Sequence, residues 1–224
     1  MRWIKNYQLF LFDFDGLLVS TEEIHFEAYK RMCKNRGVSL DWDFKRFCLA
    51  AHYSATELQR QILQEYPTLI EQEPNWQVLY AEKKDAYLEL LNEGAVHLMP
   101  GVEDLLLELE RQRVKRAVVT HSPLEQIEVI RRMNPVLDSI PTWITRELYT
   151  HPKPHPEAYQ KAIDMLSDAS DKIVGFEDTP RGLQALMGTD AKPVLICSKE
   201  HPALPELVTN SVSHYTSFLE ITDL

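Results

Sequence analysis

The sequence predicts an α/β protein in which a parallel β-sheet carries a large helical insertion. After residue 100, short apolar segments typical of strands alternate with segments of helical periodicity, as in a parallel sheet with right-handed crossovers. The first strand breaks this alternation. Asp13 follows that strand, and Thr120 ends the next strong strand 107 residues later. The residues between them have mostly helical signals. A simple strand–helix–strand unit needs only about 30.

The first strand is predicted over residues 8–12, where LFLF is apolar without polar alternation. Such a run is expected of a central parallel strand that is covered on both faces. Asp13 and Asp15 follow at once, and Gly16 permits a sharp exit of the chain. Because buried carboxylates are costly without a compensating charge, this strand end requires a positive partner.

The insertion is predicted to be helical. Thr21 is a candidate N-cap of its first helix, Gly37 is placed to end that helix, and Ser54 stands in capping-box spacing with Glu57. The predicted helices of the insertion cover residues 21–37, 54–66 and 75–94. We therefore expect a helical cap domain over residues 19–93 and a core domain over residues 1–18 and 94–224.

The rest of the chain is predicted to complete the core. The expected helices are 99–113, 123–133, 156–166 and 180–187, and the expected strands are 114–120, 141–147 (a weaker signal), 172–178 and 192–198.

Polar residues stand at the ends of three of these strands. Asp13 and Asp15 follow the first, Thr120 ends the second, and Glu177 with Asp178 ends the strand over 172–178. The carboxyl ends of parallel strands meet at one edge, where the active sites of such sheets lie. The sequence therefore predicts that these side chains converge on one site.

Four carboxylates at one sheet edge would repel one another strongly at low dielectric. A hard divalent cation offsets that repulsion, and Mg²⁺ held by one or two carboxylates, waters and phosphate is the usual form. For Glu177 and Asp178 there is an alternative, because acidic residues also favour a helix N-terminus without any catalysis. Thr179 and Pro180 fit that alternative as N-cap and first helical residue.

The segment VVTHSPLE, residues 118–125, offers groups suited to an anion. Ser122, Pro123 and Glu125 have the spacing of an N-cap, a first and a third helical residue. The free N–H groups of such a helix and the Thr120 hydroxyl suit phosphate oxygens, although an ordinary capped helix has the same pattern.

The segment HPKPHPEAY, residues 151–159, holds Lys153 between two prolines. A lysine fixed in a loop at the sheet edge can neutralise phosphate as a point cation, although a solvated loop lysine is the alternative. His151 and His155 have i,i+4 spacing, but prolines interrupt it, so we predict no metal site there.

The composition excludes several classes of protein. A net charge of −10 argues against a nucleic-acid partner, which needs a basic surface. No apolar run approaches the roughly 18 residues of a membrane span, and the N-terminal apolar stretch is too short for a signal peptide. The three cysteines lack metal-type spacing, so we expect reduced thiols and a cytoplasmic location.

Taken in order, DFDG, VVTHS, HPKPHP and GFEDTPRG resemble the four motifs of the haloacid dehalogenase (HAD) superfamily. The chain resembles more narrowly the phosphatase and β-phosphoglucomutase-like branch with a helical cap. The similarity extends over essentially the whole chain. It implies the HAD fold, a Rossmann-like parallel sheet with an inserted α-helical cap domain.

The resemblance implies a role for each motif. Asp13 matches the nucleophile that forms an aspartyl-phosphate, and Asp15 matches the general acid/base. Thr120, with His121 beside it, and Lys153 match the residues that bind the substrate phosphate. The implied partner is a small phosphorylated metabolite.

The resemblance also implies the cofactor Mg²⁺. Its ligands would be the Asp13 side chain, the Asp15 backbone carbonyl and Asp178, and Glu177 would reach the metal through water. Together, Mg²⁺ and Lys153 would offset the repulsion between an anionic nucleophile and an anionic phosphate.

We predict a phosphatase of small metabolites, such as sugar phosphates. A phosphomutase is an alternative, because His25 and Lys83 match positions where the mutases carry a histidine and a cap lysine, whereas Leu124 does not match their polar residue. A non-catalytic ligand-binding protein on this fold is a second alternative. Ser20 replaces a family aspartate, and residues 48–56 lack a glycine that relatives carry in the cap, so the motifs do not identify the substrate.

Overall fold

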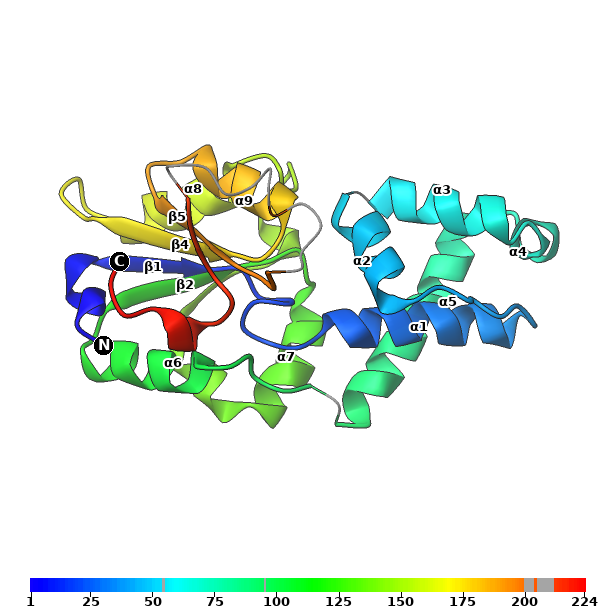
Figure 1. Ribbon diagram of the computed structural model, residues 1–224, viewed down its shortest axis with the longest axis horizontal. Helices are drawn as coiled ribbons and strands as arrows, with labels where there is room; N and C mark the ends of the chain where they lie inside the picture. The colour runs from blue at the N-terminus through cyan, green and yellow to red at the C-terminus, as the bar shows by residue number, and fades with distance from the viewer. Residues whose placement is uncertain (54, 95, 200–203, 205–211) are drawn as a thin grey trace. The chain divides into compact units, whose positions relative to one another are not determined.

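The computed structural model describes residues 1–53, 55–94, 96–199, 204 and 212–224. The chain forms two compact units (Figure 1), one of Met1–Ser20 with His97–Leu224 and one of Thr21–Val96. We call them the core unit and the cap unit. The predicted class, a parallel α/β core with an inserted helical region, is confirmed. None of the helices that the structure describes is long and apolar enough to cross a membrane.

The core unit is built on a six-stranded, all-parallel sheet with the strand order β3-β2-β1-β4-β5-β6. Its strands are β1 (Leu9–Phe12), β2 (Lys115–Val119), β3 (Thr142–Ile144), β4 (Ile173–Glu177), β5 (Lys192–Ile196) and β6 (Ser213–Tyr215). The first strand of the sequence lies at the centre, where it pairs with β2 and β4.

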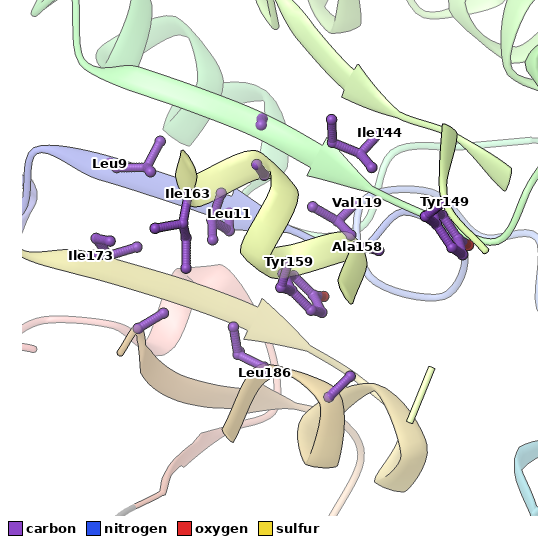
Figure 2. Close-up of a cluster of buried hydrophobic side chains, with 14 residues drawn as sticks. Leu9, Leu11, Val119, Ile144, Tyr149, Ala158, Tyr159, Ile163, Ile173 and Leu186 are labelled. Carbon is purple, nitrogen blue, oxygen red and sulfur yellow. The ribbon is translucent and has the colours of Figure 1, made fainter. Parts of the chain in front are cut away.

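Both faces of β1 are covered, as its unbroken apolar run predicts. Leu9 and Leu11 belong to a buried cluster on one face (Figure 2). On the other face Phe12 stacks on Phe176 of β4, with the ring centroids 5.3 Å apart. All four residues of β1 are fully buried. The strand thereby gives Asp13 a rigid anchor in the middle of the sheet.

Helices cover each face of the sheet. Helices α8 (Glu157–Leu166) and α9 (Pro180–Met187) supply the far side of the cluster in Figure 2, with Tyr159, Ile163 and Leu186 directed toward the strands. Helices α6 (Val102–Arg111) and α7 (Leu124–Met133) lie across the sheet from them (Figure 1).

Two features of the core differ from the sequence prediction. The strand expected over 141–147 is wrong in length, because β3 ends at Ile144 and a 3₁₀ turn follows at Arg146–Leu148. Strand β6 was not predicted. Its Ser-His-Tyr sequence is half-buried at the sheet edge and has no apolar run that would mark a strand.

The cap unit is entirely helical among the residues described. Its helices are α1 (Glu22–Asn35), α2 (Phe44–Tyr53), α3 (Ala55–Glu65), α4 (Thr68–Gln72) and α5 (Trp76–Asn92). They enclose an aromatic-rich core of their own that includes Phe26, Tyr29 and Phe47. Helices α2 and α4 were not predicted. For α2 a signal was available, since Asp43 stands directly before the helix and its Oδ1 accepts a hydrogen bond from the Arg46 N–H at 2.7 Å.

Some of the residues predicted to begin or end the helices of the cap unit do so in the structure, and others do not. Thr21 precedes α1 but does not cap it through its side chain, whereas Gly37, at φ 70°, follows the end of the helix as expected. The side chain of Asn75 caps α5 by accepting a hydrogen bond from the Gln77 N–H. Ser54, the predicted cap of α3, lies outside the described residues.

Candidate active site

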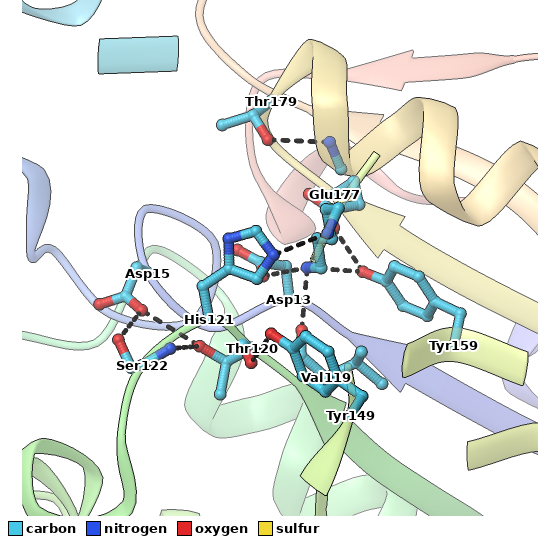
Figure 3. Close-up of polar contacts among 12 residues, drawn as sticks. Asp13, Asp15, Val119, Thr120, His121, Ser122, Tyr149, Tyr159, Glu177 and Thr179 are labelled. Atoms are coloured by element: carbon cyan, nitrogen blue, oxygen red, sulfur yellow. Dashed lines mark hydrogen bonds and ion pairs between the residues drawn. The ribbon is translucent and has the colours of Figure 1, made fainter. Parts of the chain in front are cut away.

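The predicted site residues of the core gather at the carboxyl edge of the sheet (Figure 3). Phe12 of β1 is in register with Val118 of β2 on one side and with Phe176 of β4 on the other. The chain positions that follow these residues therefore lie side by side. The Asp13 N–H continues the ladder by donating to the carbonyl of Phe176 at 3.0 Å.

Lys153 supplies the positive charge that Asp13 requires. Its Nζ lies 2.5 Å from Asp13 Oδ1, 2.6 Å from Glu177 Oε1 and 2.9 Å from the Val119 carbonyl oxygen. The Lys153 side chain is only 4% exposed. Burial alone would lower the pKa of Lys153, but Asp13 and Glu177 hold it above its ordinary value. The lysine is therefore a fixed cation.

Tyr159 belongs to the same network and was missed in the sequence analysis. Its hydroxyl donates to Glu177 Oε1 at 2.5 Å and accepts from Lys153 Nζ at 3.2 Å. Burial raises the pKa of Tyr159 well above its ordinary value, and the carboxylates of Glu177 and Asp13 add to that rise. The sequence did contain a signal for this contact. Tyr159 lies on the apolar face of α8 with Ala158 and Ala162, and a buried hydroxyl needs a hydrogen-bond partner.

Three carboxylates form a group with the character of a cation site. Oxygen atoms of Asp13, Glu177 and Asp178 all lie within 4.8 Å of one another. Burial and, after it, the Glu177 carboxylate raise the pKa of Asp13 to about 7, against the lowering effect of Lys153. Glu177 Oε2 is buried and has no hydrogen-bond partner among the described residues. These oxygen donors fit a hard divalent cation such as Mg²⁺, which prefers carboxylate ligands.

The Asp15 carboxylate lies apart from this group and faces the end of β2 (Figure 3). Its Oδ2 accepts a hydrogen bond from Ser122 Oγ at 2.6 Å and one from Thr120 Oγ1 at 3.3 Å. The prediction that Ser122 caps α7 is wrong, since Pro123 occupies the N-cap position and the helix begins at Leu124. The Ser122 hydroxyl is directed to Asp15 instead.

The predicted phosphate-binding residues Thr120 and His121 both form hydrogen bonds with neighbouring residues of the core unit. Thr120 Oγ1 accepts from the Ser122 N–H at 2.9 Å, and its carbonyl accepts from the Tyr149 hydroxyl at 2.9 Å. His121 Nε2 accepts from the Lys153 N–H at 2.9 Å. Burial lowers the pKa of His121 to about 3, with Lys153 adding to the effect, so the ring is neutral and fixes the lysine loop.

The acidic pair at the end of β4, Glu177 and Asp178, precedes helix α9. Thr179 caps α9 as predicted, accepting from the Gly182 N–H at 3.3 Å, and Pro180 is the first helical residue. Gly182 lies directly against the Glu177 carboxyl group, where a Cβ atom would collide with it. The Glu177 carboxylate therefore lies at the N-terminus of α9, where the helix dipole favours negative charge. A role of Glu177 and Asp178 at the helix N-terminus is compatible with a role at a metal site.

The predicted cap residues lie together within the cap unit. Lys83 Nζ is 2.7 Å from His25 Nδ1, and the His25 ring stacks on Tyr87 with the centroids 4.2 Å apart. Lys83 is 4% exposed and lies over the rings of Tyr29 and Tyr87. Burial, and then Lys83, lower the pKa of His25 well below its ordinary value. The lysine therefore donates to a neutral imidazole.

A parallel α/β core with an inserted helical unit, and with aspartate, threonine, lysine and a second acidic pair at one sheet edge, defines the haloacid dehalogenase-like hydrolases. The sequence model of that family, described as haloacid dehalogenase-like hydrolase, matches residues 10–195. The chain belongs to this family.

Relatives within the family include two phosphatases. The phosphorylated carbohydrates phosphatase of Thermotoga maritima is 29% identical over 180 residues, which cover 78% of each chain. The 2-deoxyglucose-6-phosphate phosphatase 2 of Saccharomyces cerevisiae is 32% identical over 198 residues, covering 80% of this chain and 76% of the yeast protein.

The fold also matches solved structures. The crystal structure of CbbY from Rhodobacter sphaeroides in complex with phosphate superposes with a TM-score of 0.75 and covers 97% of both chains at 24% identity. That agreement concerns the fold.

Proposed function

We propose that this protein is a Mg²⁺-dependent phosphatase that removes phosphate from a small phosphorylated metabolite, with sugar phosphates as the favoured class. The observation that carries the proposal is the buried Lys153, which contacts the carboxylates of Asp13 and Glu177. These two carboxylates and that of Asp178 form the candidate cation site. The arrangement provides a nucleophile, a fixed cation and a cation site at one place. The two phosphatase relatives, whose names specify phosphorylated sugars, support the substrate class.

In this proposal Asp13 attacks phosphorus through a carboxylate oxygen and forms an aspartyl-phosphate while the leaving oxygen departs. Asp15 donates the proton to that leaving oxygen, and it then takes a proton from the water that hydrolyses the intermediate. The hydroxyls of Ser122 and Thr120 hold the Asp15 carboxylate in place.

Lys153, Thr120 and the neighbouring backbone receive the phosphate. Lys153 is held as a cation by its carboxylate partners, so its charge is present before substrate arrives. His121 fixes the lysine loop through the Lys153 N–H. We assign His121 to this positioning role within the phosphate site.

The Asp13 and Asp178 carboxylates and the Asp15 backbone carbonyl would hold Mg²⁺, with Glu177 beside them. The bound ion would supply positive charge that offsets the repulsion between Asp13 and the phosphate.

The test is phosphate release from a panel of phosphate monoesters, with and without Mg²⁺. We expect Mg²⁺-dependent release by the wild type and loss of at least 10³-fold in Asp13→Asn, since that variant lacks the nucleophile. Asp104→Asn, at an exposed position in α6, is the matched control and should keep full activity.

The same panel separates the alternatives. Conversion of β-glucose 1-phosphate to glucose 6-phosphate, with little free phosphate, would replace the phosphatase with a phosphomutase. Mg²⁺ binding without turnover of any ester would favour a ligand-binding protein. Phosphate release that is independent of both Mg²⁺ and Asp13 would overturn the proposed site.

A further inference from the structure

The loop that carries Lys153 has a second cluster of metal-ligating side chains on its outer surface. Donor atoms of His151, His155 and Glu157 all lie within 4.8 Å of one another. The prolines, which interrupt helical spacing, do not keep these histidines apart. A turn closed by the His155 N–H and the Pro152 carbonyl, at 3.0 Å, brings the two rings to a centroid distance of 4.7 Å.

Glu157, at the start of α8, is oriented toward this pair by the loop backbone. It accepts hydrogen bonds from the N–H groups of Thr150 and His151, each at 2.8 Å, and His151 Nδ1 lies 2.5 Å from its Oε2. These bonds hold the Glu157 carboxylate beside the two imidazoles, where it can serve as a ligand.

We propose that His151, His155 and Glu157 bind a divalent transition-metal ion, with Zn²⁺ as the representative, on the outer surface of the Lys153 loop. Two imidazoles and one carboxylate are ligands that Zn²⁺ prefers, and water completes a tetrahedral shell. Ligands at 2.0–2.1 Å from one ion are about 3.3 Å apart. In the structure the three donor atoms lie within 4.8 Å of one another, and His151 Nδ1 and Glu157 Oε2 are 2.5 Å apart, so rotations of the exposed side chains are needed to place all three around one ion. Both histidines are exposed, so the ion has an open path.

This site is chemically distinct from the carboxylate group at the sheet edge. The outer cluster offers imidazole nitrogen, which suits Zn²⁺, Ni²⁺ and Cu²⁺, whereas Asp13, Glu177 and Asp178 offer only oxygen, which suits Mg²⁺. The inference does not depend on the proposed phosphatase activity. It would place one metal ion on the loop that carries Lys153, because His151 and His155 flank that residue in the sequence.

The test is calorimetric titration of the full chain with Zn²⁺ in the presence of excess Mg²⁺. We expect one Zn²⁺ per chain, with binding weakened at least tenfold in His151→Ala and in His155→Ala. His97→Gln removes an exposed histidine elsewhere in the core unit and should bind Zn²⁺ like the wild type. Asp178→Asn, which alters the sheet-edge carboxylates, should also leave this binding unchanged.

Electron paramagnetic resonance of bound Cu²⁺ gives an independent readout of the ligands. We expect hyperfine coupling to two imidazole nitrogens in the wild type and in Asp178→Asn, and to one or none in the two alanine variants. Absence of Zn²⁺ binding in the wild type would overturn the proposal. Unchanged binding in both alanine variants, or binding that disappears in Asp178→Asn, would overturn it as well.

Discussion

Lys153 and Asp13 are 140 residues apart in the sequence, and the lysine Nζ lies 2.5 Å from the Asp13 carboxylate inside the core unit. The same ammonium group contacts Glu177, so one buried cation serves two carboxylates. Removal of one partner from a buried ion pair leaves an uncompensated charge, which is strongly destabilising. Folding and the proposed chemistry therefore depend on the same side chain.

We expect Lys153→Met to lower the free energy of unfolding by about 3–5 kcal/mol in the absence of Mg²⁺, because two carboxylates lose their cation. Urea denaturation measures this. The double variant Lys153→Met/Glu177→Gln should recover part of the loss, and Lys172→Met, at an exposed position, should lose none. A single variant as stable as the wild type would show that the pair makes no net contribution.

Gly182→Ala should displace the Glu177 carboxyl group, because the new Cβ would collide with it. Overpacking of this kind costs about 1–3 kcal/mol. We expect a lower urea midpoint and, in addition, weaker phosphate release, since Glu177 holds Lys153. Gln184→Ala on the exposed face of the same helix is the control. Wild-type activity in the glycine variant would separate Glu177 from the site.

Asp178→Asn should weaken the dependence on Mg²⁺, since a charged oxygen ligand becomes neutral. The concentration of Mg²⁺ that gives half-maximal phosphate release should rise at least tenfold, and the increase in Tm produced by Mg²⁺ should shrink. Asp190→Asn, an exposed substitution, should match the wild type in both measurements. If the asparagine variant at 178 keeps the wild-type response to Mg²⁺, the proposed ligand set is incorrect.

Ser122→Ala should lower kcat about tenfold with little change in KM, because it removes a hydrogen bond of 2.6 Å that holds the Asp15 carboxylate. Steady-state kinetics with the best substrate of the panel provide the measurement. Ser167→Ala, after the end of α8, is the control. A rise in KM at constant kcat would instead place Ser122 in substrate binding.

Acidification should destabilise the cap unit through His25. In the folded chain burial and Lys83 hold the pKa of His25 below the unfolded value of 6.5. Below pH 6.5 the unfolded chain therefore binds a proton that the folded chain does not, and stability falls by up to about 1.4 kcal/mol per pH unit. Above pH 6.5 both states are neutral at this residue, and its contribution does not change.

Urea midpoints at pH 7.0 and pH 5.0 measure this effect. His25→Gln should lose less stability between the two values than the wild type, whereas His97→Gln should lose the same amount. Part of the loss should remain in His25→Gln, because His121 also has a lowered pKa. Equal losses in His25→Gln and the wild type would contradict the prediction.

The sequence predicted the centre of the fold better than its periphery. The run LFLF favoured a strand covered on both faces, which the structure confirms, and Asp13 follows it at once. Strand β6 and helix α4 are held by contacts that local patterns do not encode, whereas for α2 the N-cap residue Asp43 was overlooked. The sequences of β6 and α4 are short or mixed in polarity, so packing against neighbours decides their structure.

The sequence predicted which side chains gather at the edge of the sheet but not how they pair. Strand ends identified Asp13, Thr120 and Glu177 as neighbours, since parallel topology brings them together. The partner of Lys153 could not be read from the sequence, because it is 140 residues away. His151 and His155 were set aside as metal ligands because prolines interrupt their helical spacing, yet a turn brings the two rings together. The metal site proposed there rests on that proximity.

The central position of β1 has a consequence for the order of events during synthesis. Phe12 pairs with Val118 and Phe176, so the earliest strand waits for partners made more than 100 and 160 residues later. At about 5–20 residues per second, the wait for β4 is roughly 10–30 s. During that time β1 can pair only with β2, and its other edge has no strand to join. Stalled nascent chains that end before β4 should therefore remain protease-sensitive around residue 12, and a protected segment there would indicate an earlier partner.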